Sequence, residues 1–319
     1  MLFVKIILLA ILQGACELLP VSSSAHVIIA EKLMGIDPVS PEMTLLLVML
    51  HTGTMLAVII YFWRSWKRSF FESRDALAGF ALSLLAATFL TGALGLALKV
   101  VIEKILTARG TGAEVELIFG NLGIVSLALA AAGILIIYSG AKAGSGNETR
   151  SGKAFDPRKG RSSRSSLRAR SSTRIPLSAS VVIGAVQALC LPFRGFSRSG
   201  ATISTGLLAG LSRRAAEEFS FALAVVLTPP VIYKEVHRLL RSHTVWNSAS
   251  DGAGGSAPAA LDLLHLFLPS ALGMAASFLA GLLALKWLSS WLEAGRWSYF
   301  GYYCLALSAL TFALYARGF

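Results

Sequence analysis

The chain is poor in charge: 14% of its 319 residues are Asp, Glu, Lys or Arg, whereas soluble domains carry about 25%. Hydrophobic residues make up 55% of the sequence, and the mean hydropathy is +0.67. Apolar runs of about 20 residues, the length of a membrane-crossing helix, recur along the chain. The sequence lacks the alternating segments of about ten residues that build transmembrane β-barrels. These features exclude a soluble domain and indicate an all-α integral membrane protein.

Cysteine is scarce as well. Cys16, Cys190 and Cys304 lie in apolar segments without paired spacing, which excludes a disulfide framework and favours buried free thiols. No His-Glu-x-x-His pattern for a zinc ion is present. The apolar run after Lys5 resembles a secretory signal, but Gln13 stands where a lipoprotein signal has an aliphatic residue. We therefore expect this segment to remain in the mature protein.

The net charge of +12 comes largely from one stretch of the chain. Ten of the 29 Lys and Arg residues lie between Lys142 and Arg174, among serines and few apolar residues. We interpret 141–175 as a basic cytoplasmic loop, with anionic lipid headgroups as secondary partners. This clustering argues against a nucleic-acid partner.

Polar residues interrupt two of the apolar segments, at about 1–35 and 176–212. Each segment has an apolar arm, a break and a second short arm, and neither arm is clearly long enough to cross a bilayer alone. Such segments indicate re-entrant helical hairpins, whose irregular backbone must be buried in protein or line a wet cavity. Full spans are expected at about 43–63, 76–98, 115–140, 215–238, 261–288 and 297–316.

The two interrupted segments are also similar to each other. Pro20-Val-Ser-Ser-Ser-Ala-His aligns with Gly195-Phe-Ser-Arg-Ser-Gly-Ala. A hairpin followed by three spans occurs in 1–140 and again in 176–319. Because three is odd, the second half enters from the opposite face. We therefore expect an inverted-topology repeat with a site near the midplane.

Positive charges orient this topology. Basic residues at 64–74 and 141–175 place both loops in the cytoplasm, because two spans separate them. The 99–114 and 239–260 loops then face outward, and both termini end outside.

The first break carries a candidate acid–base group. Gln13 and Glu17 are four residues apart and share one helical face. Pro20 ends or kinks that helix. An ionisable group at bilayer depth costs about 2.5–3.5 kcal/mol on insertion scales, so Glu17 indicates a functional site.

Three hydroxyls follow in the same break. One of Ser22, Ser23 and Ser24 can cap a short helix that would start near residue 23, with its free N–H groups presented to an anion. His26 comes one turn later, on the face of Ser22 and Ser23. The alternative is that these serines only cap a kinked helix.

The second break supplies a cation. Arg198 offers a planar fork of donors that matches a phosphate. Ser197, Ser199 and Thr202 add hydroxyls on both sides of it. Arg194 is either a second phosphate contact or an interfacial residue.

The remaining ionisable residues have simpler interpretations. We interpret Arg213, Arg214, Glu217 and Glu218 as a solvated helix start. His51 lies in an apolar span beside two threonines and is interpreted as a packing residue.

Together the motifs carry a family resemblance. Glu17-Leu-Leu-Pro-Val-Ser-Ser-Ser-Ala-His26 and Gly195-Phe-Ser-Arg-Ser-Gly-Ala-Thr202 resemble the two signature motifs of the undecaprenyl-diphosphate phosphatases, the bacitracin-resistance proteins. The order of the motifs, the following Glu218-Phe-Ser-Phe221 and the number of spans agree as well. The resemblance implies hydrolysis of a C55 lipid, undecaprenyl diphosphate, which recycles the carrier of peptidoglycan synthesis. It also implies a multi-pass protein of the bacterial inner membrane, with its site open to the periplasm.

By position, the resemblance assigns catalytic roles to four residues and phosphate contacts to the polar residues around them. The catalytic set is Glu17, Ser23, His26 and Arg198. The phosphate-contact set is Gln13, Ser22, Ser24, Arg194, Ser197, Ser199 and Thr202. Gln13 stands at the first acidic position of the family pattern, and Arg194-Gly195 replaces the family's Pro-Gly.

Several points stay open at this level. Either Ser23 or a water attacks the phosphate, and either Glu17 or His26 acts as base and then as acid. The resemblance suggests that Mg²⁺ or Ca²⁺ bridges Glu17 and the phosphates, and it implies no organic cofactor. A polyprenyl-phosphate flippase is the alternative function, because inverted repeats with broken helices are transporter architecture. The oligomeric state, monomer or homodimer, is also open.

Overall fold

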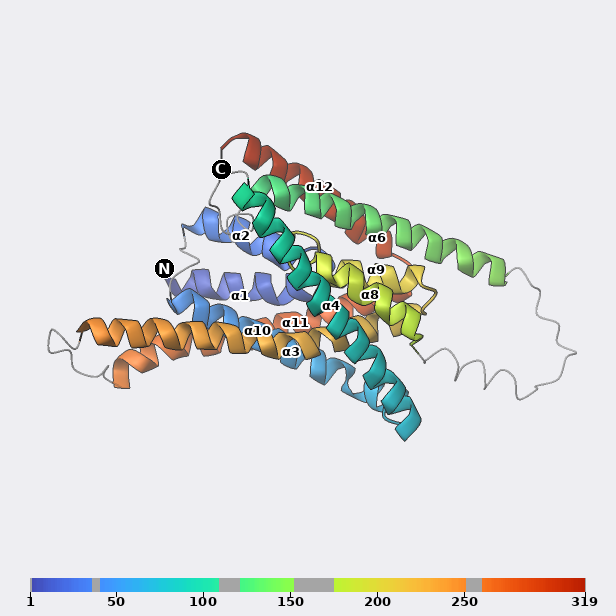
Figure 1. Ribbon diagram of the computed structural model, residues 1–319, viewed down its shortest axis with the longest axis horizontal. Helices are drawn as coiled ribbons and strands as arrows, with labels where there is room; N and C mark the ends of the chain where they lie inside the picture. The colour runs from blue at the N-terminus through green and yellow to red at the C-terminus, as the bar shows by residue number, and fades with distance from the viewer. Residues whose placement is uncertain (1, 36–40, 109–120, 152–174, 251–259, 319) are drawn as a thin grey trace, which may run out of the picture. The chain divides into compact units, whose positions relative to one another are not determined.

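The computed structural model describes residues 2–35, 41–108, 121–151, 175–250 and 260–318 (Figure 1). These residues form helices and connecting turns, with no strand among them. The helices of the described part are α1 (Leu2–Leu18), α2 (Ser23–Met34), α3 (Pro41–Ser69), α4 (Arg74–Ala108), α6 (Leu122–Ser151), α8 (Leu177–Leu189), α9 (Arg198–Leu208), α10 (Arg213–Ser250), α11 (Ala260–Glu293) and α12 (Trp297–Ala316).

Among the described helices, five contain segments long and apolar enough to cross a membrane. The segments are Leu45–Ser69, Arg74–Ile105, Leu122–Ala143, Leu268–Glu293 and Trp297–Ala316. They confirm the expected all-α membrane class and correspond to five of the six expected spans. The sixth expectation, 215–238, falls in α10, which contains Pro229 and Pro230 and is not among these five.

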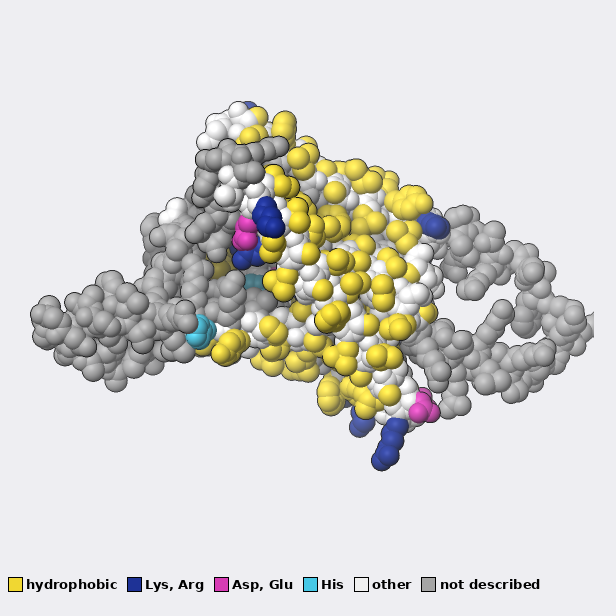
Figure 2. All heavy atoms as spheres, in the orientation of Figure 1, with side chains coloured by type: hydrophobic (Ala, Val, Ile, Leu, Met, Phe, Trp, Pro, Cys, Tyr) yellow, Lys and Arg dark blue, Asp and Glu magenta, His cyan; other side chains and the backbone are white. Residues whose placement is uncertain are grey.

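The outer surfaces of the spanning helices are apolar, as contact with lipid tails requires. On α4, Leu82, Leu85 and Phe89 are exposed, the last by 76%. Figure 2 shows hydrophobic side chains over much of the described part of one face. This distribution is expected of helices that present leucine and phenylalanine to a bilayer.

Several helices extend beyond the apolar runs that predicted them. Helix α6 continues to Ser151, past the expected end of the span at 140, and α4 continues to Ala108. Hydropathy marks where a helix leaves the membrane, but Lys and Glu support helix beyond that point in α4, whereas the end of α6 also contains Gly144 and Gly146, which do not. The greater part of the expected basic loop, 152–174, lies outside the described residues, as do 109–120 and 251–259.

The chain packs into two compact units, each built from segments distant in sequence. The first unit comprises Met1–Leu18, Ser23–Tyr61 and Ala224–Lys286, and the second comprises Leu19–Ser22, Phe62–Leu223 and Trp287–Phe319. This division describes packing and does not follow the two sequence halves. The symmetry of 1–140 and 176–319 therefore stays a prediction.

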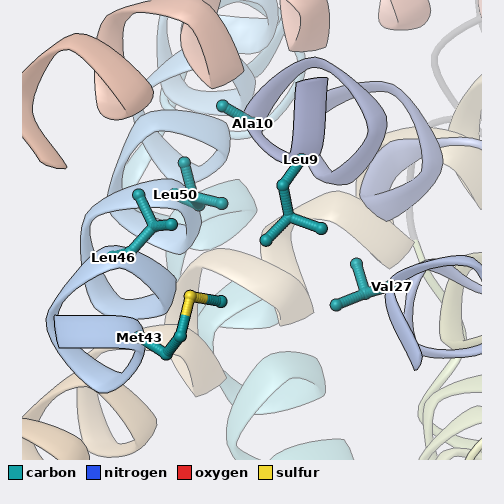
Figure 3. Close-up of a cluster of buried hydrophobic side chains, with 6 residues drawn as sticks. All are labelled: Leu9, Ala10, Val27, Met43, Leu46 and Leu50. Atoms are coloured by element: carbon teal, nitrogen blue, oxygen red, sulfur yellow. The ribbon is translucent and has the colours of Figure 1, made fainter. Parts of the chain in front are cut away.

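The first unit has a core where α1, α2 and α3 meet. Its buried side chains point toward one another in Figure 3: Leu9, Ala10, Val27, Met43, Leu46 and Leu50. Helix α11 approaches α1 at Gly14, where an added Cβ would lie 2.5 Å from the Ser277 carbonyl oxygen. It approaches α3 in the same way at Gly53, 2.4 Å from the Met274 carbonyl oxygen. Glycine thus permits the close helix packing typical of membrane proteins.

In the second unit, α6 packs along α12 and α4 along α8 (Figure 1). Small residues bring the backbones together, since a Cβ on Gly133 would lie 2.8 Å from the Gly301 carbonyl oxygen. The buried Trp297 ring fixes the start of α12. Its indole N–H lies 3.1 Å from the hydroxyl oxygens of both Ser139 and Ser204.

Candidate functional site

The first polar motif forms a sharp break between two helices. Helix α1 ends at Leu18 and α2 begins at Ser23, which confirms the expected helix start near residue 23. Within the break, Ser22 has a φ of 64°. This left-handed conformation is costly for a residue other than glycine and is often found at functional sites.

The carboxylate of Glu17 accepts two hydrogen bonds on one oxygen. The Ser23 hydroxyl donates to Oε2 over 2.5 Å, and the Gln13 amide nitrogen donates to the same oxygen over 3.1 Å. Gln13 is buried, whereas Glu17 and Ser23 are half-buried. The structure thus brings together three of the residues that the sequence proposed, and it joins a hydroxyl to a carboxylate that can take its proton.

His51 also contacts this cluster. Its Nε2 lies 3.3 Å from the Gln13 amide nitrogen, and its Nδ1 lies 2.7 Å from the Leu47 carbonyl oxygen. The interpretation of His51 as a packing residue did not include this contact with Gln13. No local pattern indicated this contact, because 38 residues separate Gln13 and His51.

The other polar residues of the first motif lie on the same short segment. Ser24 and His26 are half-buried on the first turn of α2, and Ser22 is buried. Among the residues that the structure describes, no group of three or more His, Cys, Asp or Glu is placed to hold a metal ion.

The break itself packs within the second unit. The Ser199 hydroxyl donates to the Leu19 carbonyl oxygen over 3.1 Å, and the Cys304 thiol donates to the Pro20 carbonyl oxygen over 3.3 Å. These two bonds satisfy two backbone carbonyls of the break. All three cysteines are free thiols, as expected, although Cys190 is only partly buried.

The second motif forms the amino-terminal end of α9. The Ser197 hydroxyl caps the helix by accepting from the Gly200 N–H over 3.2 Å. Gly195 has a φ of +112°, and a Cβ there would lie 2.6 Å from the Val125 carbonyl oxygen. Arg198 is the first residue of α9 and is half-buried, while Arg194 is exposed.

The hydroxyls near Arg198 bond within the protein. Thr202 donates to the Arg198 carbonyl oxygen over 2.8 Å and lies 2.5 Å from the Ser220 hydroxyl. Ser197, Ser199 and Thr202 are all buried. These contacts position the loop and α9, and direct phosphate contacts by the three hydroxyls stay a prediction. Ser220 was missed, although it lies in the Glu218-Phe-Ser-Phe221 stretch.

The start of α10 is only in part the solvated helix start that the sequence suggested, because Arg214 is exposed but the two glutamates are not. Glu217 and Glu218 are each only 3% exposed. Glu217 accepts from the Ser289 hydroxyl, and Glu218 accepts from the Ser65 hydroxyl and from Arg214, whose Nε lies 2.8 Å away. Partners distant in sequence thus bury both carboxylates, which residue type alone could not reveal.

Comparison with known proteins identifies the family. Residues 6–310 match the family described as bacitracin resistance protein BacA. The chain is 52% identical to "Undecaprenyl-diphosphatase 2" of Acinetobacter baylyi, over 97% of this chain and 96% of that protein. It is 27% identical to "Undecaprenyl-diphosphatase" of Rhodopirellula baltica, over 98% of both chains, and 29% identical to the protein of that name from Novosphingobium aromaticivorans, over 97% of this chain and 96% of the relative. Taken with the two motifs, these matches show that the chain belongs to the bacitracin resistance protein BacA family.

Proposed function

We propose that this enzyme removes the terminal phosphate of undecaprenyl diphosphate, giving undecaprenyl phosphate and inorganic phosphate. The relatives are named for this activity, and the apolar helices suit a C55 lipid substrate. In a bacterial inner membrane the reaction would recycle the lipid carrier of peptidoglycan synthesis and confer bacitracin resistance. The site would open to the periplasm, in an inverted repeat of two re-entrant hairpins.

The observation that carries this proposal is the Ser23–Glu17 hydrogen bond of 2.5 Å. A hydroxyl bound to a carboxylate is the arrangement of a nucleophile and its general base. In the proposed reaction, Ser23 Oγ attacks the terminal phosphorus while its proton passes to Glu17. The bond between that phosphorus and the bridging oxygen breaks, and undecaprenyl phosphate leaves.

A second step would regenerate the enzyme. Water attacks the phosphorus of the phosphoserine and gives a proton to the site, the Ser23–phosphorus bond breaks, and inorganic phosphate is released. His26 or Glu17 serves as the proton carrier in this step. If a water attacks the substrate directly, the same carboxylate activates that water instead.

We further propose that Arg198 binds the diphosphate. Its guanidinium would stabilise charge that develops on the transferred phosphoryl group. The amino-terminal end of α9 adds the positive end of the helix dipole, which favours an anion. Support for joining the two motifs in one site comes from the family resemblance. The proposed further phosphate contacts are Gln13, Ser22, Ser24, Arg194, Ser197, Ser199 and Thr202.

A divalent cation would bind at this site together with the phosphates of the substrate. Mg²⁺ is commonly bound by one or two carboxylates together with phosphate oxygens, and Glu17 would be the protein ligand. When bound, Mg²⁺ or Ca²⁺ would neutralise phosphate charge. A homodimer is compatible with the proposal, which needs no residue from a second copy.

The test is phosphate release from undecaprenyl diphosphate by the purified protein in detergent. Glu17→Gln, Ser23→Ala and Arg198→Ala should each lower kcat by about 10²–10⁴, the usual contribution of a general base or an oxyanion donor. Glu103→Gln and Arg317→Ala are matched controls, because Glu103 pairs with Lys99 on α4 and Arg317 is exposed at the end of α12.

Two results would contradict the proposal. Full phosphate release by Glu17→Gln and Arg198→Ala would reject the site. Lipid translocation by the wild-type protein in vesicles, without phosphate release, would favour the flippase. An active Ser23→Ala variant would reject only Ser23 as the nucleophile, and trapping of phosphorylated Ser23 would support it.

A further inference from the structure

His51 has a defined hydrogen-bonding state. Its Nδ1 lies 2.7 Å from the Leu47 carbonyl oxygen, one helical turn earlier on α3. A carbonyl oxygen can only accept, so Nδ1 carries a proton. In the neutral ring, Nε2 is then an acceptor, and it points to Gln13 on α1, 3.3 Å away.

Gln13 is the link between His51 and the carboxylate. Its side chain is 2% exposed, and its amide nitrogen contacts both Glu17 Oε2 and His51 Nε2. An amide NH₂ has two protons, which is one for each of these acceptors. The reversed amide would place its oxygen against an ionised carboxylate oxygen, which is repulsive. Glu17 and His51 together therefore select one orientation of Gln13.

The contacts continue to the proposed nucleophile. From the Leu47 carbonyl, they run through His51 and Gln13 to Glu17, and Ser23 donates to the same Glu17 oxygen. The residues all belong to the first compact unit. His51 Nε2 thus orients the Gln13 amide. The amide nitrogen in turn donates to the same Glu17 oxygen that accepts from Ser23.

We propose that His51 is a positioning residue for the reaction, which acts through Gln13 to hold the Glu17 carboxylate in place for Ser23. The inference rests on the proposed function, since it assumes that Glu17 is the working base. No hydrogen bond from His51 to Ser23 or Glu17 is found in the described part of the chain, so its effect must pass through the amide. Outer groups that orient an active-site ligand typically change activity by about 10- to 100-fold when removed.

The experiment compares kcat and KM for phosphate release from undecaprenyl diphosphate across a double-mutant cycle. His51→Phe keeps a ring but removes the acceptor, so kcat should fall about 10- to 100-fold with KM unchanged. His51→Gln restores an acceptor of similar reach and should recover most of the activity. In a Gln13→Met background, His51→Phe should cause no further loss, because the group that it orients is gone.

Folding is checked by size exclusion and thermal unfolding of each variant. If His51→Phe does not purify as a folded protein, His51→Asn replaces it, because its side chain is polar but too short to reach Gln13. The proposal is overturned if the variant that lacks the acceptor has wild-type kcat, or if its loss is equally large in the Gln13→Met background. A purely structural histidine would give that second result.

The same series separates this inference from the proposed function. An inactive Glu17→Gln with a fully active His51→Phe overturns only the role of His51. A fully active Glu17→Gln overturns the proposed base, and with it the premise of the inference.

Discussion

Gly14→Ala should destabilise the first compact unit. Gly14 lies on α1, where a Cβ would come 2.5 Å from the Ser277 carbonyl oxygen and 2.8 Å from the Ser277 Cα on α11. These are backbone atoms, which cannot rotate away as the end of a side chain could. One of the two helices must therefore shift to admit a single methyl group.

The expected magnitude combines two opposing effects. Overpacking costs about 1–3 kcal/mol, and contact with backbone places this case at the upper end. Alanine in a helix recovers about 1 kcal/mol relative to glycine. The net loss is about 2 kcal/mol, which corresponds to a fall of about 3 °C in Tm for a chain of this size.

The assay is thermal unfolding of the purified protein in detergent, with Gly92→Ala as the matched control. Gly92 lies within α4, and an added Cβ there meets no atom within 4 Å. Its Tm should stay the same or rise, because only the helix preference acts. A Gly14→Ala variant as stable as Gly92→Ala would refute the close approach of α1 and α11. Adding Ser277→Ala should not rescue Gly14→Ala, because the clash involves the backbone.

Three further outcomes are expected. Trp297→Phe should lower the free energy of unfolding by about 1–3 kcal/mol, because two buried hydroxyls lose their shared donor, whereas Trp287→Phe at a site 45% exposed should change it little. Gly195→Ala should lower the Tm more than Gly210→Ala does. Both glycines have positive φ, but only a Cβ on Gly195 would meet backbone, at 2.6 Å. Equal losses in Tm would show that φ alone matters. Chelation with EDTA should abolish phosphate release and Mg²⁺ or Ca²⁺ should restore it, whereas activity that persists in EDTA would reject the cation.

Local patterns predicted the parts of the site that lie close in sequence. The i,i+4 spacing of Gln13 and Glu17, the proline break and the run of serines were enough to place α2 at Ser23. The sequence analysis placed no helix start in the second motif, where α9 begins at Arg198 with Ser197 as its cap. In each case a helix end is determined by residues within one turn of it.

Contacts between distant segments could not be predicted in this way. The burial of Glu217 depends on Ser289, 72 residues later, and that of Glu218 depends on Ser65. His51 reaches Gln13 only because α3 packs beside α1. The length of α4 was underestimated for a different reason, since hydropathy reports on the membrane and not on helix propensity.

The left-handed backbone of Ser22 has a consequence for which substitutions this position accepts. At a φ of 64°, glycine has no steric strain, asparagine and aspartate have little, and β-branched residues such as valine have the most. A saturation library selected for function should therefore rank Ser22→Gly above Ser22→Ala, and Ser22→Ala above Ser22→Val, if the hydroxyl is dispensable. If Ser22→Gly is instead as inactive as Ser22→Val, the hydroxyl is what the position preserves. Comparing these variants thus shows whether position 22 requires a left-handed backbone or a hydroxyl group.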